Sequence, residues 1–292
     1  MHRALPVLAV LAVLTAIWYL GAWRMNTPWA LAQAERAGVE LSAGELFTET
    51  MRQERPRLPA PHQVAAELWK TTGEMALRGR AFSKRSLIYH GAITLGATLT
   101  GFALGVALGI LGAVAITYSR VAEMSLMPWA IVSQTIPIVA LAPMIIVLSN
   151  AVGIEGRTVP KAIISAYLCY FPVLVGMVKG LNSPSASQLD LLKTYNASGR
   201  DSFFKLRLPA SMPYLFTSLK VAIAAALVGT IVGELPTGAI SGLGARILIG
   251  DQFGTPLAIW AALFAAAILA GLLVTVIGGV QALVLRRMGM AR

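Results

Sequence analysis

Long uncharged apolar stretches, separated by short polar connections, make up most of the chain. A helix needs about 20 apolar residues to cross a bilayer core of about 30 Å. Stretches of about this length cover residues 4–23, 91–118, 127–148, 162–178, 214–235 and 257–285. The pattern predicts an all-α integral membrane protein with six transmembrane helices. The third stretch contains Pro128, Pro137 and Pro143, which predict a kink.

The first stretch, Ala4–Trp23, could be a signal peptide or a membrane anchor. It is 20 residues long, and it ends with Tyr19 and Trp23, aromatic residues that favour the membrane–water interface. We therefore expect a retained N-terminal anchor.

Composition agrees with a membrane protein and excludes several chemistries. Hydrophobic residues make up 57% of the chain and charged residues only 13%. The net charge is +11, but the basic residues lie between the apolar stretches, which is typical of membrane topology and not of nucleic-acid binding. Cys169 is the single cysteine and the three histidines are scattered, so we expect no intrachain disulfide and no metal site.

The distribution of Lys and Arg predicts the orientation. With a cytoplasmic N-terminus, the inner set would be Arg3, Arg120, Lys179, Lys193, Arg200, Lys205, Arg207, Lys220, Arg286, Arg287 and Arg292. The short outer connections would hold only Arg157, Lys161 and Arg246. This bias places both termini in the cytoplasm. Residues 24–90 would lie outside despite their own basic residues, because segments of about 60 residues are translocated largely regardless of charge.

The chain thus divides into an anchor (1–23), an outer segment (24–90), a membrane core (91–287) and a short cytoplasmic tail (288–292). In the outer segment, the extended Leu58-Pro59-Ala60-Pro61 precedes an amphipathic helix over residues 63–71, with Val64, Leu68 and Trp69 on one side. We expect this helix to lie along the membrane surface. It could pack on neighbouring spans or dock a partner.

Sequence signatures of enzymes are missing from the chain. It contains no Gly-Lys dipeptide for a Walker A loop, no His-Glu-x-x-His and no Gly-x-Ser-x-Gly. We therefore expect no catalytic residues and no cofactor in this chain. The small-residue spacing of Gly101, Gly105, Gly109 and Gly112 is typical of close helix packing.

The connection between the fourth and fifth stretches, residues 183–213, predicts two short helices. Ser187 would cap a first helix over residues 188–195, in which Leu189, Leu192 and Tyr195 share one side, and the helix would stop at Asn196.

Ser198 and Asp201 repeat the capping pattern for a second helix. This helix carries Phe203, Phe204 and Leu206, and Leu208-Pro209 would end it. The pair would lie across the cytoplasmic ends of the spans.

Residues 190–209 resemble the EAA loop of permease subunits of binding-protein-dependent ABC importers. In that loop an acidic residue precedes a glycine by six positions, and Leu-Pro follows at a fixed distance. With Leu208-Pro209 aligned, the acidic position falls on Asp190, the two alanines on Leu191 and Leu192, the glycine on Asn196, and the usual Ala-Ser on Ala197-Ser198.

The likeness covers about 230 residues, from Leu58 to Arg287. Leu58-Pro59-Ala60-Pro61 resembles the Leu-Pro-Ser-Pro of the nitrate, sulfonate, taurine and hydroxymethylpyrimidine branch, as do Val232-Gly233-Glu234 and Gly242-Leu243-Gly244.

The chain departs from the family at Asn196 and at the two leucines. Asparagine adopts the left-handed backbone conformation better than other residues with side chains, so the turn is expected to survive. The larger leucines put in doubt which ATPase groove would fit.

The resemblance implies a type I importer permease in a bacterial inner membrane. Two copies would form a homodimer, separate cytoplasmic ABC ATPase subunits would bind ATP, and a periplasmic or lipid-anchored binding protein would deliver the solute. It favours a thiamine-precursor pyrimidine or similar heteroaromatic, with sulfonate, taurine or nitrate as alternatives, over an ion-coupled secondary transporter. The implied coupling-helix surface consists of Asp190, Leu191, Leu192, Tyr195, Asn196, Ala197, Ser198, Phe203, Leu208 and Pro209. Phe203 could instead pack beneath the loop on its own spans.

Polar residues inside the apolar stretches are candidates for the translocation path. Ser133, Gln134 and Thr135 precede Pro137, whose missing N–H interrupts the helix. Glu234 is the carboxylate closest to membrane depth, and it could line the path or form an ion pair with Arg246 or Arg157.

Overall fold

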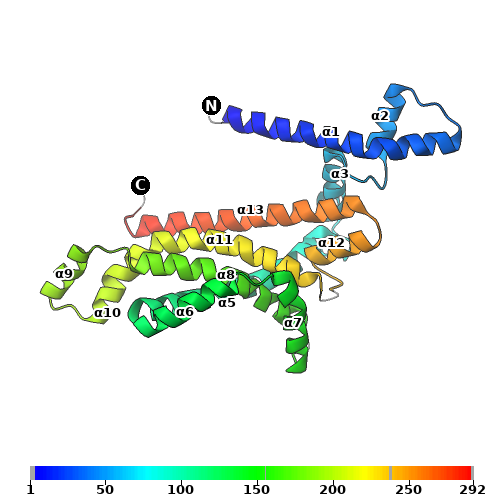
Figure 1. The fold of residues 1–292 in the computed structure, drawn as a ribbon. Helices are drawn as coiled ribbons and strands as arrows, with labels where there is room; N and C mark the ends of the chain where they lie inside the picture. The colour runs from blue at the N-terminus through cyan, green and yellow to red at the C-terminus, as the bar shows by residue number, and fades with distance from the viewer. Residues whose placement is uncertain (1–3, 155, 237–238, 291–292) are drawn as a thin grey trace. The chain divides into compact units, whose positions relative to one another are not determined.

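The computed structural model describes residues 4–154, 156–236 and 239–290, and within these ranges its regular elements are all helical. Five helices are long and apolar enough to cross a membrane, and the bent pair α6 and α7 makes a sixth span if counted as one. The long elements are α1 (Ala4–Ala37), α5 (Leu87–Tyr118), α6 (Arg120–Ser133), α7 (Ile138–Ala151), α8 (Thr158–Leu181), α11 (Leu208–Glu234) and α13 (Pro256–Arg287) (Figure 1). The all-α expectation is confirmed.

The chain forms two compact units. The first unit comprises residues through His90 together with Ala245–Ala266, and it holds α1, α2 (Ala43–Arg52), α3 (Pro61–Thr71), α4 (Gly73–Leu77) and most of α12 (Leu243–Gln252). The second unit comprises Gly91–Gly244 and the end of α13.

In the first unit, α1 does not end at Trp23 but continues to Ala37. The buried Asn26 lies in this extension, and its side chain both donates to the Leu58 carbonyl (2.8 Å) and accepts from the Leu58 amide (3.2 Å). The indole of Trp18 donates to the Pro59 carbonyl at 3.0 Å. The extended Leu-Pro-Ala-Pro segment is therefore held along α1, where Ala22, Met51 and Ala60 form a small core.

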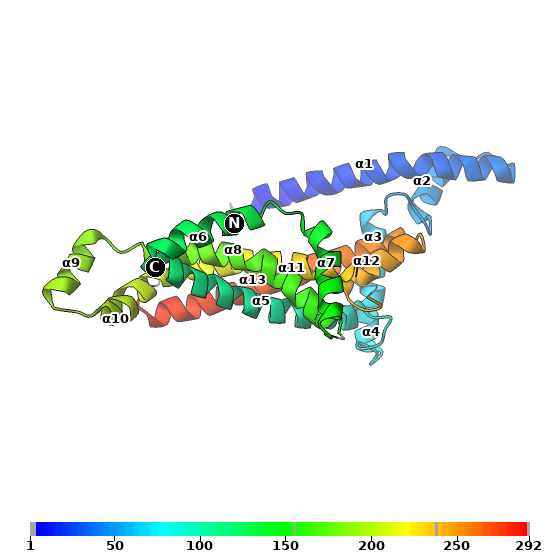
Figure 2. The ribbon, with the colours of Figure 1, turned by 60° about the horizontal axis from the view of Figure 1, so that its bottom comes forward.

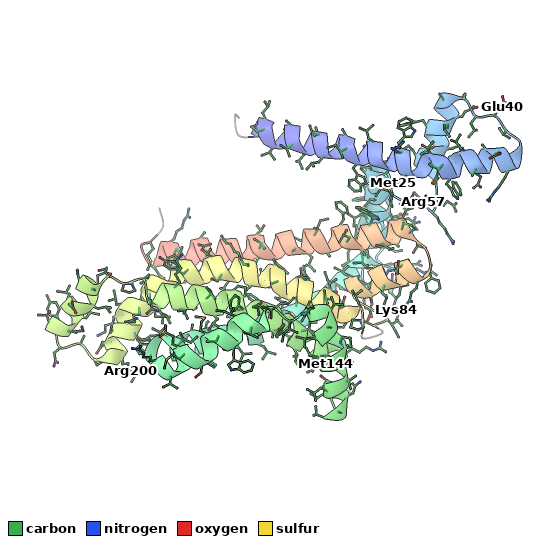
Figure 3. The ribbon with its side chains drawn as sticks, viewed as in Figure 1. Met25, Glu40, Arg57, Lys84, Met144 and Arg200 are labelled. Atoms are coloured by element: carbon green, nitrogen blue, oxygen red, sulfur yellow. The ribbon has the colours of Figure 1, made fainter. Side chains whose placement is uncertain are left out.

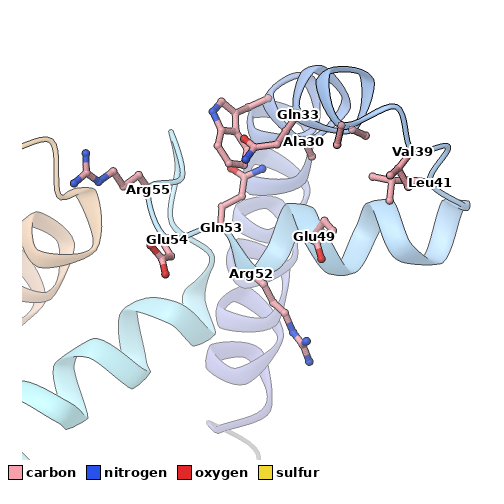
Figure 4. Close-up of a pocket in the computed structure, with 12 residues that line it drawn as sticks. Ala30, Gln33, Val39, Leu41, Glu49, Arg52, Gln53, Glu54 and Arg55 are labelled. Carbon is pink, nitrogen blue, oxygen red and sulfur yellow. The ribbon is translucent and has the colours of Figure 1, made fainter.

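The expected amphipathic helix is α3, which starts at Pro61. Val64 is buried, whereas Trp69 is exposed, so the expected side is only partly covered in the described structure. A hollow of about 620 Å³ lies between the far part of α1 and α2, with Gln33, Glu49 and Arg52 among its walls (Figure 4).

The second unit is built on the antiparallel pair of α8 and α11, with α5 packed against α8. Small residues let these helices approach closely: a side chain at Gly109 would meet Val173 of α8, and one at Gly229 of α11 would meet the backbone of Ser165. The core includes Cys169, Val173, Met177 and Leu181 of α8 with Ala222 and Ala226 of α11.

In the third apolar stretch the expected kink is a sharp break. The stretch divides into α6 and α7, whose axes differ by 104° across a break of four residues. Apart from this stretch and the first one, which α1 extends, the four remaining apolar stretches begin and end within six residues of α5, α8, α11 and α13.

Candidate functional site

The predicted two-helix loop lies at one end of the α8–α11 pair (Figures 1 and 2). Its first helix, α9 (Ala186–Thr194), is capped by Ser185 and not by Ser187. The Ser185 hydroxyl accepts from the Gln188 amide (3.3 Å), and the Gln188 side chain accepts from the Ser185 amide (3.0 Å). A capping box needs Glu or Gln at its third helical residue, and Gln188 supplies it for Ser185. Asp190 instead pairs with Lys193 at 2.9 Å.

The turn after α9 confirms the expectation for Asn196. Its φ is +50°, the single positive φ of a non-glycine residue among the described ranges. The Asn196 amide donates to the Lys193 carbonyl (2.8 Å) and the Ala197 amide to the Leu192 carbonyl (3.0 Å). These two bonds are those of a Schellman C-cap, so the turn has a defined geometry.

The second helix begins as predicted and ends differently. The Ser198 hydroxyl accepts from the Asp201 amide at 3.1 Å and starts α10 (Gly199–Ser202). The prediction that Leu208-Pro209 ends this helix is wrong, because α10 continues through the π turn η1 (Phe203–Arg207) into α11. A proline in the first turn of a helix needs no N–H, and the Leu208 amide bonds five residues back to Phe203.

The loop is anchored to the helix ends by Arg207. Its guanidinium donates to the Leu181 carbonyl (2.9 Å) and to the Asn182 side chain (3.1 Å), at the end of α8, and lies over the ring of Tyr118. Phe203 packs edge-on against Tyr118 and touches the core of the unit.

The implied coupling residues divide by exposure. The exposed residues are Asp190, Leu191, Tyr195, Asn196 and Ser198, and the half-buried ones are Leu192, Ala197, Phe203, Leu208 and Pro209. Tyr195 is 77% exposed. Figure 3 labels Arg200 on the same loop. The exposed group presents the aromatic ring of Tyr195 and the aliphatic side chain of Leu191 beside the carboxylate of Asp190.

The path candidates Ser133, Gln134, Thr135 and Pro137 meet at the break between α6 and α7. Pro137 cannot donate to the Ser133 carbonyl, and the Ile136 amide reaches this carbonyl with a long bond (3.4 Å). The Tyr167 hydroxyl of α8 donates to that carbonyl, and the Tyr170 hydroxyl bonds the Ser133 hydroxyl. Two tyrosines therefore hold the break, while Gln134, Thr135 and Pro137 stay exposed in the described unit.

A groove of about 700 Å³ runs beside this break between α5, α6 and α8. Its walls are mainly apolar and include Leu108, Trp129, Ser133, Tyr167 and Tyr170.

Glu234 has a different partner from those expected. It pairs with Lys161 at 3.3 Å, with neither Arg246 nor Arg157, and its side chain is fully buried. Lys161, assigned from the sequence to an outer connection, is 4% exposed within α8. Glu234 is therefore buried among the described helices of the second unit.

Comparison with known proteins defines the family. The model of the family described as "Binding-protein-dependent transport system inner membrane component" matches residues 105–290. The chain belongs to this family. The match includes the loop, the α6–α7 break and the α8–α11 pair, and it identifies the chain as the permease of an ABC importer, a transport protein and not an enzyme.

Named relatives cover much of the permease. A probable ABC transporter permease protein of Haemophilus influenzae is 34% identical over 58% of this chain and 67% of its own length. The formylaminopyrimidine transport permease protein ThiX of Halalkalibacterium halodurans is 32% identical over 64% and 68%, respectively. The riboflavin transport system permease protein RibX of Chloroflexus aurantiacus is 30% identical over 76% and 74%.

More distant matches confirm the branch. A putative aliphatic sulfonates permease of Bacillus subtilis and a nitrate import permease of Leptolyngbya laminosa are each 26% identical over 67% of this chain. Membership of the family implies, in general, an ATPase and a binding protein as partners.

The sequence did not reveal Lys161, Tyr167 or Arg207 as important residues. Two local signals were present in the sequence. Lys161 is a lysine close to an apolar stretch, and Tyr167 forms an i, i+3 pair with Tyr170 on a span that follows a proline break.

Proposed function

We propose that α9 and its turn form the surface through which this permease receives motion from a cytoplasmic ATPase. The supporting observation is mechanical: the turn is closed by two defined hydrogen bonds, and the chain continues as unbroken helix from Gly199 to Glu234. A displacement of α9 would therefore reach a membrane-spanning helix without passing through a loose linker. Leu191 and Tyr195 would enter the groove of the ATPase, with Asp190, Asn196 and Ser198 around them.

Phe203, Leu208 and Pro209, with Leu192 and Ala197, would act beneath this surface. Phe203 packs on Tyr118, so its part in coupling would be to seat the loop on the spans.

The solute path would pass the α6–α7 break. Irregular backbone at membrane depth is tolerated where it meets protein or a water-filled cavity, not lipid. Ser133, Gln134, Thr135 and Pro137 would therefore face the path or the second copy of a homodimer.

The substrate would be a small heteroaromatic solute, with a pyrimidine of the thiamine-precursor type preferred. Support comes from two relatives, 32% and 30% identical to this chain. They are named as permeases for formylaminopyrimidine and for riboflavin, respectively. Sulfonate, taurine and nitrate are the alternatives. The permease would sit in the inner membrane with both termini in the cytoplasm, and a periplasmic or lipid-anchored protein would deliver the solute.

Uptake by proteoliposomes tests this proposal. The permease is reconstituted with its ATPase and binding protein, and uptake of labelled formylaminopyrimidine is measured with ATP inside, with a non-hydrolysable analogue as control. We expect ATP-dependent uptake that excess unlabelled pyrimidine suppresses and that sulfonate or nitrate leaves unchanged. Suppression by sulfonate alone would reverse the substrate ranking, and uptake driven by an ion gradient without ATP would contradict the coupling role.

A further inference from the structure

A buried polar cluster lies at the end of the α8–α11 pair away from the coupling loop. Glu234, the last residue of α11, accepts hydrogen bonds from three segments among the described residues. These come from Lys161 of α8 (3.3 Å), from the Thr94 hydroxyl of α5 (3.0 and 3.2 Å to the two oxygens) and from the Gly244 amide (2.7 Å). Glu234 and Thr94 have no exposed surface, and Lys161 is also buried. A buried carboxylate is stable only with such partners, so the cluster is a built feature.

The backbone around Gly242 and Gly244 is shaped for this carboxylate. Gly242 has a φ of +129°, which side-chain-bearing residues rarely adopt, and a Cβ there would lie on the carboxylate of Glu234. A Cβ at Gly244 would also meet the Glu234 side chain, at 2.9 Å. The Leu243 amide donates to the Thr94 hydroxyl at 2.9 Å. The motif Gly242-Leu243-Gly244 therefore binds its own chain at Glu234 and Thr94.

Polar contacts continue from the cluster into the helices. The Thr98 hydroxyl lies 2.8 Å from the Thr94 carbonyl and 3.0 Å from the Thr230 hydroxyl of α11. The Ser165 hydroxyl of α8 donates to the Ala226 carbonyl of α11 at 2.9 Å. In an apolar environment such bonds resist sliding of one helix along another.

Close packing continues to the loop end of the same pair. A side chain at Gly176 would meet Ser218, and one at Gly180 would meet Ser211 at 2.8 Å. With a rise of about 1.5 Å per residue, α8 spans about 36 Å between its ends. The two helices are thus in tight contact from the Arg207 anchor to Lys161.

We infer that Lys161, Glu234 and Thr94 form a clamp that fixes the Gly242–Gly244 turn to the α8–α11 pair, so that loop, helix pair and turn move as one body. Glu234 is then a positioning residue and does not bind the solute. The clamp itself follows from the contacts, and only the source of the movement rests on the proposed coupling function.

A pair of spin labels tests the clamp directly. Ser187→Cys on α9 and Ile240→Cys beside the turn are both exposed positions outside the cluster, and the native Cys169 is buried and does not compete for label. Distances are measured in the full permease, diluted with unlabelled chain, first in detergent and then with the ATPase with and without ATP. We expect one narrow distance distribution whose mean is the same in all three states. A shift of the mean with ATP would overturn the single-body motion.

Gly242→Ala removes the clamp from the turn without changing any charge. We expect it to broaden the distribution and shift its mean, whereas Gly96→Ala, where a Cβ meets open space in α5, keeps the distribution of the parent. An unchanged distribution in Gly242→Ala would overturn the clamp. Because the detergent measurement needs no ATPase, this outcome is separate from a failure of the proposed coupling function.

Substitutions of the charged pair separate a positioning role from solute binding. Glu234→Gln and Lys161→Met each remove one member of the buried ion pair and should lower the yield of folded protein, and the double variant should recover it. In transport by the double variant, the KM for solute should stay at the parent value while uptake per ATP falls. A raised KM with unchanged uptake per ATP would show that Glu234 contacts the solute.

Discussion

At the scale of single residues, the break between α6 and α7 shows how one missing donor is replaced. Pro137 removes the N–H that would bond the Ser133 carbonyl, and the hydroxyl of Tyr167 takes its place from another helix. A buried acceptor left without such a bond costs free energy at membrane depth, so the tyrosine stabilises the bent conformation.

Tyr167→Phe should therefore lower the free energy of unfolding by about 1 kcal/mol. The control is the same substitution in a Pro137→Ala background, where the restored amide can bond Ser133 and the cost should be smaller. Thermal unfolding of the detergent-solubilised protein measures both, and equal costs in the two backgrounds would contradict the pairing of Tyr167 with Pro137.

Asn196 gives a second prediction at this scale. Asn196→Gly should keep uptake and the coupled ATPase activity, because glycine adopts a φ of +50° freely. Asn196→Val should weaken the turn by roughly 1–2 kcal/mol, because the left-handed conformation is costly for a β-branched side chain. We expect the valine variant to insert normally and to hydrolyse ATP with reduced uptake. Equal uptake by the two variants would remove the role assigned to this turn.

At the scale of elements, local signals predicted the turn at Asn196 and the second helix start, but not the cap of α9 or the continuation of α10 into α11. Ser198 and Asp201 form the expected cap, and Asn196 turns the chain as expected. Pro209 was misread because a proline after a helix and a proline in the first turn of the next helix look alike in sequence. The geometry of η1, which joins the two, depends on how Arg207 and Phe203 seat on α8 and α5.

The identity of the residue that caps α9 can be measured. Ser185→Ala should cost about 1 kcal/mol of local helix stability, because it removes one half of the capping box. Ser187→Ala, two residues further along the chain, should have almost no effect. Hydrogen exchange of the α9 amides compares the two, and the opposite order would restore Ser187 as the cap.

At the scale of the whole molecule, the spans and the family resemblance were readable from sequence, but the pairing of Glu234 was not. Hydropathy locates apolar helices without stating which of them touch. The sequence suggested Arg157 or Arg246 as the partner of Glu234, whereas the packing of α8 on α11 places Lys161 opposite it. The extension of α1 to Ala37 was missed for a related reason, since the buried bond of Asn26 to Leu58 joins residues that are distant in sequence.

Orientation across the membrane is a prediction for the whole chain. Single cysteines replacing Phe82 and Tyr195, both largely exposed, should react differently with a membrane-impermeant maleimide in intact spheroplasts. Phe82→Cys should be labelled at once, because residues 24–90 are expected outside, and Tyr195→Cys only after permeabilisation. Immediate labelling of Tyr195→Cys would place the coupling loop on the wrong side for an ATPase.

The π turn between α10 and α11 is equivalent to one inserted residue in an otherwise continuous helix. Deleting a residue there would rotate α10 and the turn before it by about 100° around the axis of α11 and leave the spans in place. A change of one codon could thus re-aim Leu191 and Tyr195 toward a differently shaped motor subunit, so this turn offers permeases a simple route to exchange ATPases without rebuilding their pore.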